Sequence, residues 1–306
     1  MADVIKNRSE ILFLYDVTDA NPNGDPNDEN KPRIDEETGI NIVTDVRLKR
    51  TIRDYLFEYK KKEIFIREIR DKKDELKTKE KRLADFKDSK DILNKCVDLR
   101  LFGATTAVEE QRMNLTGPVQ FKYGRSLHKV NLTFIKGTTV MPSGEEKKQG
   151  TFTERYILPY SLIAFYGVIN ETAAITQDIP LTEDDIDLMM AAIWYGTKNL
   201  ISGSKFGQNP RFLLQVIYKK GLSFYIGELD KRIKLISDKQ DEEIRRVEEV
   251  NLDVTQLIDA LNEQKEKIQL LRIKTDERLQ FLRGKQITDI AQTLKELKLP
   301  VKEFNF

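Results

Sequence analysis

The stretch EILFLYDV, residues 10–17, is a short apolar run of strand-forming residues, and the prediction of the fold starts from it. The segment after it, TDANPNGDPNDENKPRIDEETGIN (18–41), is crowded with Asn, Pro, Gly and Asp, which favour turns over helix and strand. From Thr44 the pattern becomes helical. One apolar stripe then follows helical spacing, formed by Leu48, Ile52, Tyr55, Leu56 and Tyr59.

Further elements follow in an informative order. Residues 117–135 alternate in the manner of a strand, and 160–169 (YSLIAFYGVI) form another apolar strand. A second helix opens at Pro180, with Thr182 as its N-cap and acids in its first turn. Residues 211–218 (RFLLQVIY) supply one more strand. The resulting β-α-β-β-α-β order predicts an α+β fold of the ferredoxin-like, RRM type.

We expect one elaborated domain over residues 1–306, interrupted by insertions. The first insertion, 60–110, begins with a charge run that holds 11 Lys/Arg and 6 Asp/Glu over residues 60–82. It is interpreted as a solvated helical segment, with an RNA-contacting arm as the alternative. The second, 137–159, looks like a β-hairpin whose tip is Pro142-Ser-Gly. Residues 221–306 form a C-terminal extension that completes the fold.

Composition excludes several classes of protein. One cysteine, Cys96, allows no disulfide within the chain and no Cys₄ or Cys₂His₂ zinc site. His128 is the only histidine, which rules out an HExxH site. No run approaches the roughly 18–20 apolar residues of a membrane span, and no apolar signal core follows the first residues. The expected location is the cytoplasm.

The net charge of +1 argues against nucleic acid only until charge is examined locally. Residues 111–144 and 195–220 contain several Lys and Arg but no Asp or Glu. Both windows interleave these cations with Phe, Tyr and small residues, which suits phosphate contacts and base stacking. Lys122, Arg125 and Lys198 are therefore candidate RNA contacts. The alternative is a basic face without a ligand.

Cations also crowd the start of the helix that follows Thr44. Arg47, Lys49, Arg50 and Arg53 lie where the helix dipole favours acids, so a bound phosphate would explain them. The alternative is that these side chains point to water. The loop ISGSKFGQNPR (201–211) could hold phosphate as well, through Ser204, Lys205 and exposed N–H groups. It is not a Walker A loop, because GxxxxGK[ST] is absent.

An acidic cluster surrounds the first loop and comprises Asp16, Asp19, Asp25 and Asp28. Such a cluster could bind Mg²⁺ for two-metal hydrolysis. The same residues equally suit a chain of turns in which Asp caps backbone N–H groups, and this is the preferred interpretation. No catalytic residue, metal or cofactor is predicted.

Five segments, in this order, resemble the crRNA-wrapping backbone subunit of Type I CRISPR surveillance (Cascade) complexes, the Cas-seven family of the RAMP superfamily, with subtype I-B as the best match. They are NRSEILFLYDVTDANPNGDP (7–26), GINIVTDVRLKRTIRDYL (39–56), DLRLFG (98–103), LTGPVQFKYGRSLH (115–128) and GTKNLISGSKFGQNPRFLLQV (196–216). Together they span most of the chain and are strongest between residues 8 and 220.

The resemblance implies a modified RRM-like palm, a helical fingers insertion (60–110) and a β-hairpin thumb (137–159). Such subunits form a homo-oligomeric filament along the guide crRNA, and each thumb displaces one base over its neighbour. Guide contacts carry over to Arg47, Lys49, Arg50, Arg53, Ser204 and Lys205, and the base-displacing candidates are Met141 and Phe152. The implied partners are crRNA, target DNA paired to the guide, copies of this chain, and the other Cascade subunits: the 5′-end capping subunit, the large and small subunits and the processing endonuclease.

Two alternatives remain open at the level of sequence. Related Type III backbone subunits cleave RNA with an aspartate in the loop after the first strand, here the region of Asp25 and Asp28. A metal-dependent endoribonuclease is therefore the first alternative. The second is an RNA-binding module unrelated to CRISPR.

Overall fold

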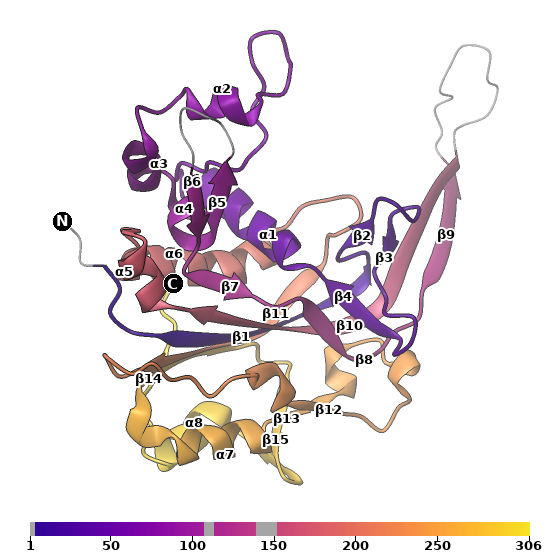
Figure 1. Ribbon diagram of the computed structural model, residues 1–306. Helices are drawn as coiled ribbons and strands as arrows, with labels where there is room; N and C mark the ends of the chain where they lie inside the picture. Colours follow the sequence, from indigo (N-terminus) through magenta and orange to yellow (C-terminus); the bar gives the residue numbers. More distant parts are fainter. Residues whose placement is uncertain (1–3, 107–112, 139–151) are drawn as a thin grey trace.

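The computed structural model describes residues 4–106, 113–138 and 152–306, and a nine-stranded sheet lies at its centre (Figure 1). Seven strands follow one another across it in the order β17 (Val301–Glu303), β14 (Ile268–Thr275), β11 (Gln208–Tyr218), β1 (Ser9–Ala20), β10 (Phe152–Ile169), β8 (Gly124–Lys129) and β4 (Ile40–Val43). Two more, β7 (Val119–Phe121) and β9 (Thr133–Thr138), pair with β10. Among the described strands of this sheet, only the β14–β17 pair is parallel.

Strand β1 lies in the middle of this sheet and is buried on both faces. Every residue from Ser9 to Val17 is buried. Phe13 and Tyr15 point into one hydrophobic core, while Leu12 and Leu14 belong to a second core on the opposite face. A strand that is covered on both faces has a nearly continuous apolar sequence, which explains the apolar run EILFLYDV.

Helices cover the first face: α1 (Asp45–Glu58), α5 (Glu171–Thr176) and α6 (Glu183–Ala191), which continues into a π-helical turn, η2 (Ala192–Gly196). Thr182 is the N-cap of α6, as predicted, and it forms a capping box with Asp185. Leu48, Ile52 and Met189 lie in the shared core. The predicted α1 stripe ends one turn early, because Tyr59 follows the last turn of the helix and is 51% exposed.

The C-terminal residues from 221 onward cover the second face. They add strand β14 to the sheet and place α7 (Thr255–Glu263) and α8 (Ile290–Glu296) beneath it (Figure 1). Leu229, Ile258 and Leu294 pack in the same core as Leu12. A small second sheet in this region has the order β12 (Lys234–Ile236), β13 (Asn251–Asp253), β15 (Gln280–Arg283) and β16 (Gln286–Thr288). Short 3₁₀ turns occupy Leu229–Lys231, Asp241–Glu243, Val247–Glu249 and Lys265–Lys267.

The first insertion is less helical than its sequence predicts. Residues 60–78 hold turns and isolated bridges, and helix appears only in α2 (Lys79–Leu83), α3 (Ser89–Lys95) and α4 (Val97–Phe102). The dense charge run lacks an apolar stripe that could bury one face of a helix, so tertiary contacts decide its shape. Phe65, Phe86 and Ile92 form a small core with Leu99. The short strands β5 (Gly103–Thr106) and β6 (Met113–Thr116) pair beside it.

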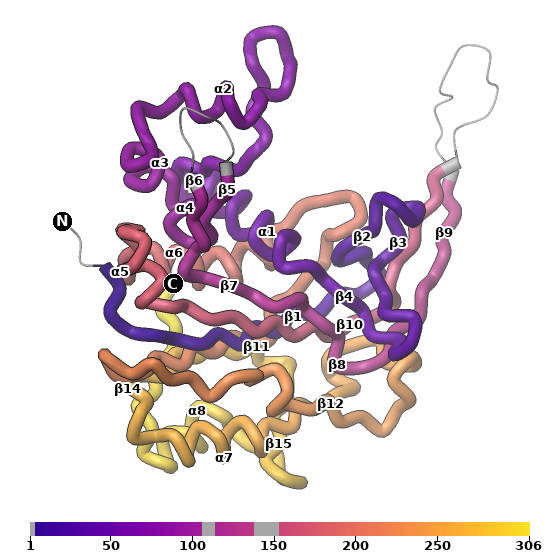
Figure 2. The backbone as a smooth tube through the Cα atoms, in the orientation of Figure 1, coloured from indigo at the N-terminus to yellow at the C-terminus, as the bar shows by residue number. Residues whose placement is uncertain are grey.

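Two paired strands lie in the segment of the predicted hairpin, and their pairing begins earlier than expected. They are β9 and the first part of β10, paired from Thr133↔Ile157 to Thr138↔Phe152. Residues 139–151, with the predicted tip and Met141, lie outside the described residues, as does the side chain of Phe152. Two small strands, β2 (Gly24–Asp25) and β3 (Lys31–Pro32), lie near the base of the hairpin. Figure 2 shows the hairpin and the 60–106 segment rising on the same side of the sheet as α1.

The larger elements therefore occur in the predicted order. Along the chain they are β1, α1, β8, β10, α6 and β11, and the four strands lie side by side as β11–β1–β10–β8. The prediction of an α+β fold is confirmed. Among the described residues, no helix has the length and apolar character needed to cross a membrane.

His128 lies buried within this sheet. Its Nε2 accepts a hydrogen bond from the Leu162 N–H (3.2 Å), and its Nδ1 faces the carbonyl oxygens of Lys129 (2.8 Å) and Asp241 (3.2 Å). These contacts assign the proton to Nδ1 of a neutral ring. Burial lowers the pKa of His128, and the opposing influence of the nearby carbonyls and of the Asp241 and Glu242 carboxylates is smaller.

We predict that the free energy of unfolding falls as the pH drops below the ordinary histidine pKa of about 6.5. The unfolded chain then binds a proton that the folded protein does not, which costs up to about 1.4 kcal/mol per pH unit. Melting temperatures measured between about pH 7.5 and 5.5 check this, because only histidine titrates there at its unperturbed pKa. His128→Asn should be less stable but show a flatter pH dependence, and equal slopes for the two proteins would contradict the prediction.

Candidate nucleic-acid interface

The four cations predicted at the start of α1 have different surroundings. Lys49 is buried, its Nζ lies 2.8 Å from Asp45, and it rests over the Phe102 ring. Arg53 is also buried, and its Nε donates to Asp98 at 3.0 Å. Both side chains are committed to contacts within the protein.

Arg50 is half exposed and only partly committed. Its Nε donates to both carboxylate oxygens of Asp54 (2.7 and 2.9 Å), one turn along the helix. Glu68 lies 3.7 Å from its guanidinium. An exposed pair of this kind contributes little to stability, so Arg50 could exchange these carboxylates for another anion.

Arg47 differs from its three neighbours because no carboxylate in the described part of the chain pairs with it. Its Nη2 donates to the Thr51 hydroxyl (2.9 Å), and its buried Nε has no acceptor among the described residues. Burial lowers the pKa of Arg47. The opposing attraction of the Asp54 carboxylate is smaller, and Asp54 does not form an ion pair with Arg47. Desolvating a cation without an ion-pair partner is costly, so this position favours an anion.

The Gly/Ser loop brings Lys205 close to Arg47. Lys205 is half-buried, and burial, then repulsion from Arg47, lowers its pKa. Its Nζ lies 3.3 Å from the Ser204 hydroxyl, the one hydrogen-bond partner it has among the described residues. Two desolvated cations that repel one another would both be stabilised by one phosphate between them.

A third cation, Arg155, lies beside the same loop. It extends from β10 where the hairpin leaves the sheet, and its Nη1 donates to the Gly203 carbonyl oxygen at 2.6 Å. On the other side, the Asn21 N–H donates to the Ser204 carbonyl oxygen at 2.7 Å. The described residues offer Arg155 no carboxylate partner. We call Arg47, Arg155 and Lys205 the cation cluster.

Sequence reasoning missed Arg155. It follows Glu154 and lies outside both acid-free windows, so local charge counting did not single it out. Its contact with Gly203 depends on how the hairpin and the loop after η2 meet in space. The available signal was the position of Arg155 in the expected hairpin arm.

The remaining predicted cations lie apart from the cluster. Lys122 is paired with Glu228 (2.9 Å), and Arg125 with Asp35 (3.3 Å), both in exposed contacts. Lys198 is exposed and follows the π-helical turn before the loop. Of the predicted site residues, Arg47, Ser204 and Lys205 thus lie together. Lys122, Arg125 and Lys198 are dispersed on the surface, and Lys49 and Arg53 are buried in ion pairs. Arg50 is intermediate between these groups.

The acids of the first loop are engaged in ways that favour turns over a metal site. Asp25 pairs with Arg33, and Asp28 with Lys31 at 2.7 Å. Asp16 is buried against Arg211 (2.9 Å), and burial raises its pKa. Within residues 4–106, 113–138 and 152–306, no group of three or more His, Cys, Asp or Glu could hold a metal ion.

The DLRLFG segment joins the insertion to the rest of the protein. Asp98 is fully buried and accepts hydrogen bonds from the Phe65 and Ile66 N–H groups (2.8 and 3.1 Å) as well as from Arg53. Arg100 binds Asp185 of α6 through two hydrogen bonds, at 2.8 and 2.7 Å. These contacts fix the insertion against α1 and α6.

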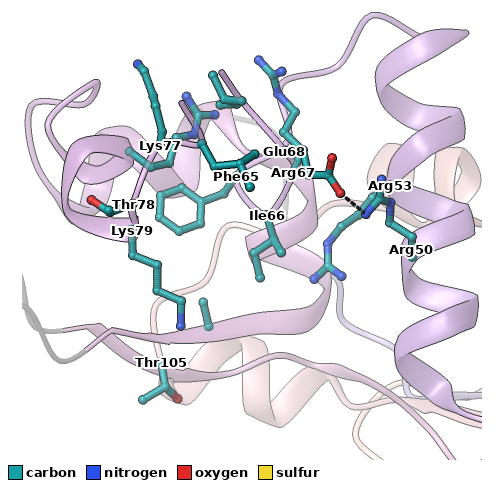
Figure 3. A pocket seen from close by; sticks show the side chains of 14 residues that line it. Arg50, Arg53, Phe65, Ile66, Arg67, Glu68, Lys77, Thr78, Lys79 and Thr105 are labelled. Carbon is teal, nitrogen blue, oxygen red and sulfur yellow. Dashed lines mark ion pairs between the residues drawn. The ribbon is translucent and has the colours of Figure 1, made fainter. Parts of the chain in front are cut away.

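A cavity of about 450 Å³ opens between this insertion and α1 (Figure 3). Its apolar lining includes Phe65, Ile66 and Leu76. Several cations surround it, but Arg53 and Lys77 are paired with Asp98 and Asp85, and Arg50 faces Glu68 across the opening. The cavity therefore presents less unpaired charge than the cation cluster.

Comparison with known proteins identifies the family. Residues 7–255 match the family model described as CRISPR-associated protein Cas7. The chain belongs to the Cas7 family. A CRISPR-associated protein of Haloferax volcanii, itself named Cas7, is 34% identical over 305 residues, with 90% of this chain and 88% of the relative covered.

Solved structures share the fold of this chain. One chain of a CRISPR RNA-guided surveillance complex has a TM-score of 0.53 at 15% identity, with 88% of this chain and 89% of that chain covered. A chain of such a complex in a pre-nicking state has a TM-score of 0.58 at 11% identity, with 97% and 96% covered. Membership in the Cas7 family confirms the family that was predicted from the sequence. It excludes the alternative of an RNA-binding module unrelated to CRISPR.

We predict that Asp98→Ala destabilises this Cas7-family chain by about 3–5 kcal/mol, because it leaves Arg53 buried without a partner. Two backbone N–H groups also lose their acceptor. Urea denaturation measures the change, and Glu277→Ala, which removes an exposed acid, is the control. Equal stability of the two variants would show that the Arg53 pair is not needed for the fold.

Proposed function

We propose that this protein is a crRNA-binding backbone subunit of a Type I CRISPR surveillance complex. Copies of it assemble along one guide RNA and present the guide for pairing with target DNA in antiviral defence. The observation that carries the proposal is the cation cluster in a member of the Cas7 family. Lys205 of the Gly/Ser loop lies near Arg47 of α1, Arg155 of β10 binds the same loop, and none of the three forms an ion pair with a carboxylate of the described residues.

The chemistry of the cluster suits a guide whose sequence varies. Arg and Lys bind phosphates through charge and hydrogen bonds, and such contacts carry no sequence information. The sequence of the target is read by base pairing to the guide. Both faces of the central sheet are covered by hydrophobic cores, so the guide follows loops and helix ends on the α1 side and not the sheet surface.

We assign the family's parts to this chain as follows. The central sheet with its helices is the palm, the 60–110 insertion the fingers, and the hairpin around 137–159 the thumb. The two projections on the α1 side support this assignment, and the sequence motifs favour subtype I-B (Figure 1). Met141 and Phe152 remain the proposed base-displacing residues.

Guide contacts are proposed for exposed or unpaired groups only. Arg47, Ser204 and Lys205 form the centre, and Arg155 joins them. Arg50, Lys122, Arg125 and Lys198 are peripheral contacts that would exchange weak surface pairs or water for phosphate. Lys49 and Arg53 are assigned structural roles because they are buried in ion pairs.

The proposed partners are the guide crRNA, target DNA paired to it, copies of this chain, and the other subunits of the complex. No catalytic step is assigned to the protein. The carboxylates that a metal-dependent nuclease would need are engaged with Arg33, Lys31 and Arg211.

We predict that Arg47→Ala and Lys205→Ala each weaken binding of single-stranded RNA whatever its sequence. Each lost phosphate contact should also reduce the slope of log affinity against log salt by about 0.7. Fluorescence anisotropy over a salt series measures both quantities. The matched control is Lys295→Ala, an exposed lysine on α8 beneath the opposite face. Identical affinity and slope in all four proteins would overturn the role of the cluster.

We further predict that the purified complex does not cut complementary RNA in the presence of Mg²⁺. Gel analysis of labelled target RNA checks this prediction. Regularly spaced cuts that disappear in Asp28→Ala would establish the nuclease alternative instead.

A further inference from the structure

The loop that carries Lys205 also holds the two most exposed large apolar side chains of the described chain. Ile201 is 83% exposed and Phe206 73% exposed. They flank Ser202–Lys205 on either side. Exposure of apolar side-chain area to water is unfavourable in free energy. Two largely exposed apolar side chains on one loop therefore suggest a contact that is made in a complex.

The exposure of Phe206 does not come from a loosely attached loop. The Lys205 and Phe206 N–H groups both donate to the Ser202 carbonyl oxygen (3.2 and 3.1 Å), which closes a tight turn. Asn21 and Arg155 hold the carbonyl groups of Ser204 and Gly203. Gly207 has φ +91°, a conformation that other residues rarely adopt, and it leads the chain directly into β11. The ring is thus presented outward by an anchored backbone.

The charges around Phe206 indicate which kind of partner fits its ring. The loop and its neighbours display Arg47, Arg155 and Lys205, and among the described residues none of the three has a carboxylate partner. A protein surface that covered Phe206 would need its own acids to match these cations. Single-stranded RNA supplies both complements at once, a phosphate for the cations and a flat base for the ring.

We propose that Phe206 is a stacking platform for one nucleobase of the guide, next to the phosphate held by the cation cluster. This inference rests on the proposed function and adds a base contact that does not depend on sequence, because every base has a π face. Ile201 has no such face and is not expected to stack.

The test uses the full-length protein and a single-stranded RNA of about 12 nucleotides, within the span of one binding site. Phe206→Ala should weaken binding roughly 5- to 100-fold, the range seen when a stacking aromatic is removed. The salt slope should not change, since stacking releases no counterions. Phe206→Trp should bind like the unaltered protein, and Ile201→Ser is the matched control for loss of an exposed apolar side chain.

An RNA of the same length without bases separates stacking from phosphate contact. On this abasic strand Phe206→Ala and the unaltered protein should bind equally. The indole fluorescence of Phe206→Trp should be quenched by ordinary RNA but not by the abasic strand, measured against the constant background of Trp194, which is buried.

The outcomes distinguish this inference from the proposed function. If Phe206→Ala binds as tightly as the unaltered protein while Lys205→Ala binds more weakly, the stacking role is overturned and the RNA-binding role stands. If neither change weakens binding, both are overturned. If Phe206→Ala binds the short RNA normally but fails to form multimers on a long guide, Phe206 contacts a second copy of this chain and the stacking role is overturned.

Discussion

The burial of β1 on both faces is the constraint on which the rest of the structure depends. Its side chains alternate between two separate hydrophobic cores, one shared with α1 and α6 and one shared with the C-terminal helices. An RRM-type sheet usually offers one open face to RNA. Here that face is filled by residues from Leu229 to Leu299, so a ligand is excluded from the sheet surface and must bind elsewhere, for example at strand ends, loops and helix starts. The cation cluster lies at such a place.

Two buried acids on β1 hold this C-terminal cover in position. Glu10 accepts hydrogen bonds from the Tyr166 and Tyr218 hydroxyls and from the Ile226 and Gly227 N–H groups. Asp16 binds Arg211, which also pairs with Asp276 at 2.5 Å. A buried carboxylate is tolerated when donors surround it, and removing one partner is costly. These polar contacts therefore link the two halves of the protein in a way that apolar packing alone would not specify.

Much of the fold could be predicted because it rests on local patterns. The apolar run of β1, the stripe of α1 and the Thr182 N-cap are readable from adjacent residues, and their order predicts the sheet. The site was harder to predict because it depends on distant partners. The sequence placed Arg47 and Arg53 in the first turns of α1, but it could not show that Asp98 pairs with Arg53, whereas Arg47 has no ion-pair partner among the described residues. Likewise, the charge run at 60–78 carried no periodicity, and long-range contacts such as Arg82 with Glu63 determine its shape.

Strand β10 extends without interruption from Ile169 in the core to Phe152 in the projecting hairpin. Arg155 and Tyr156 lie where it leaves the sheet, and they are tied to Gly203 and to Glu29. The projection and the sheet are thus one stiff piece, without a linker between them. The direction in which the projection points is therefore fixed by the sheet, and reorienting it would require bending the sheet itself.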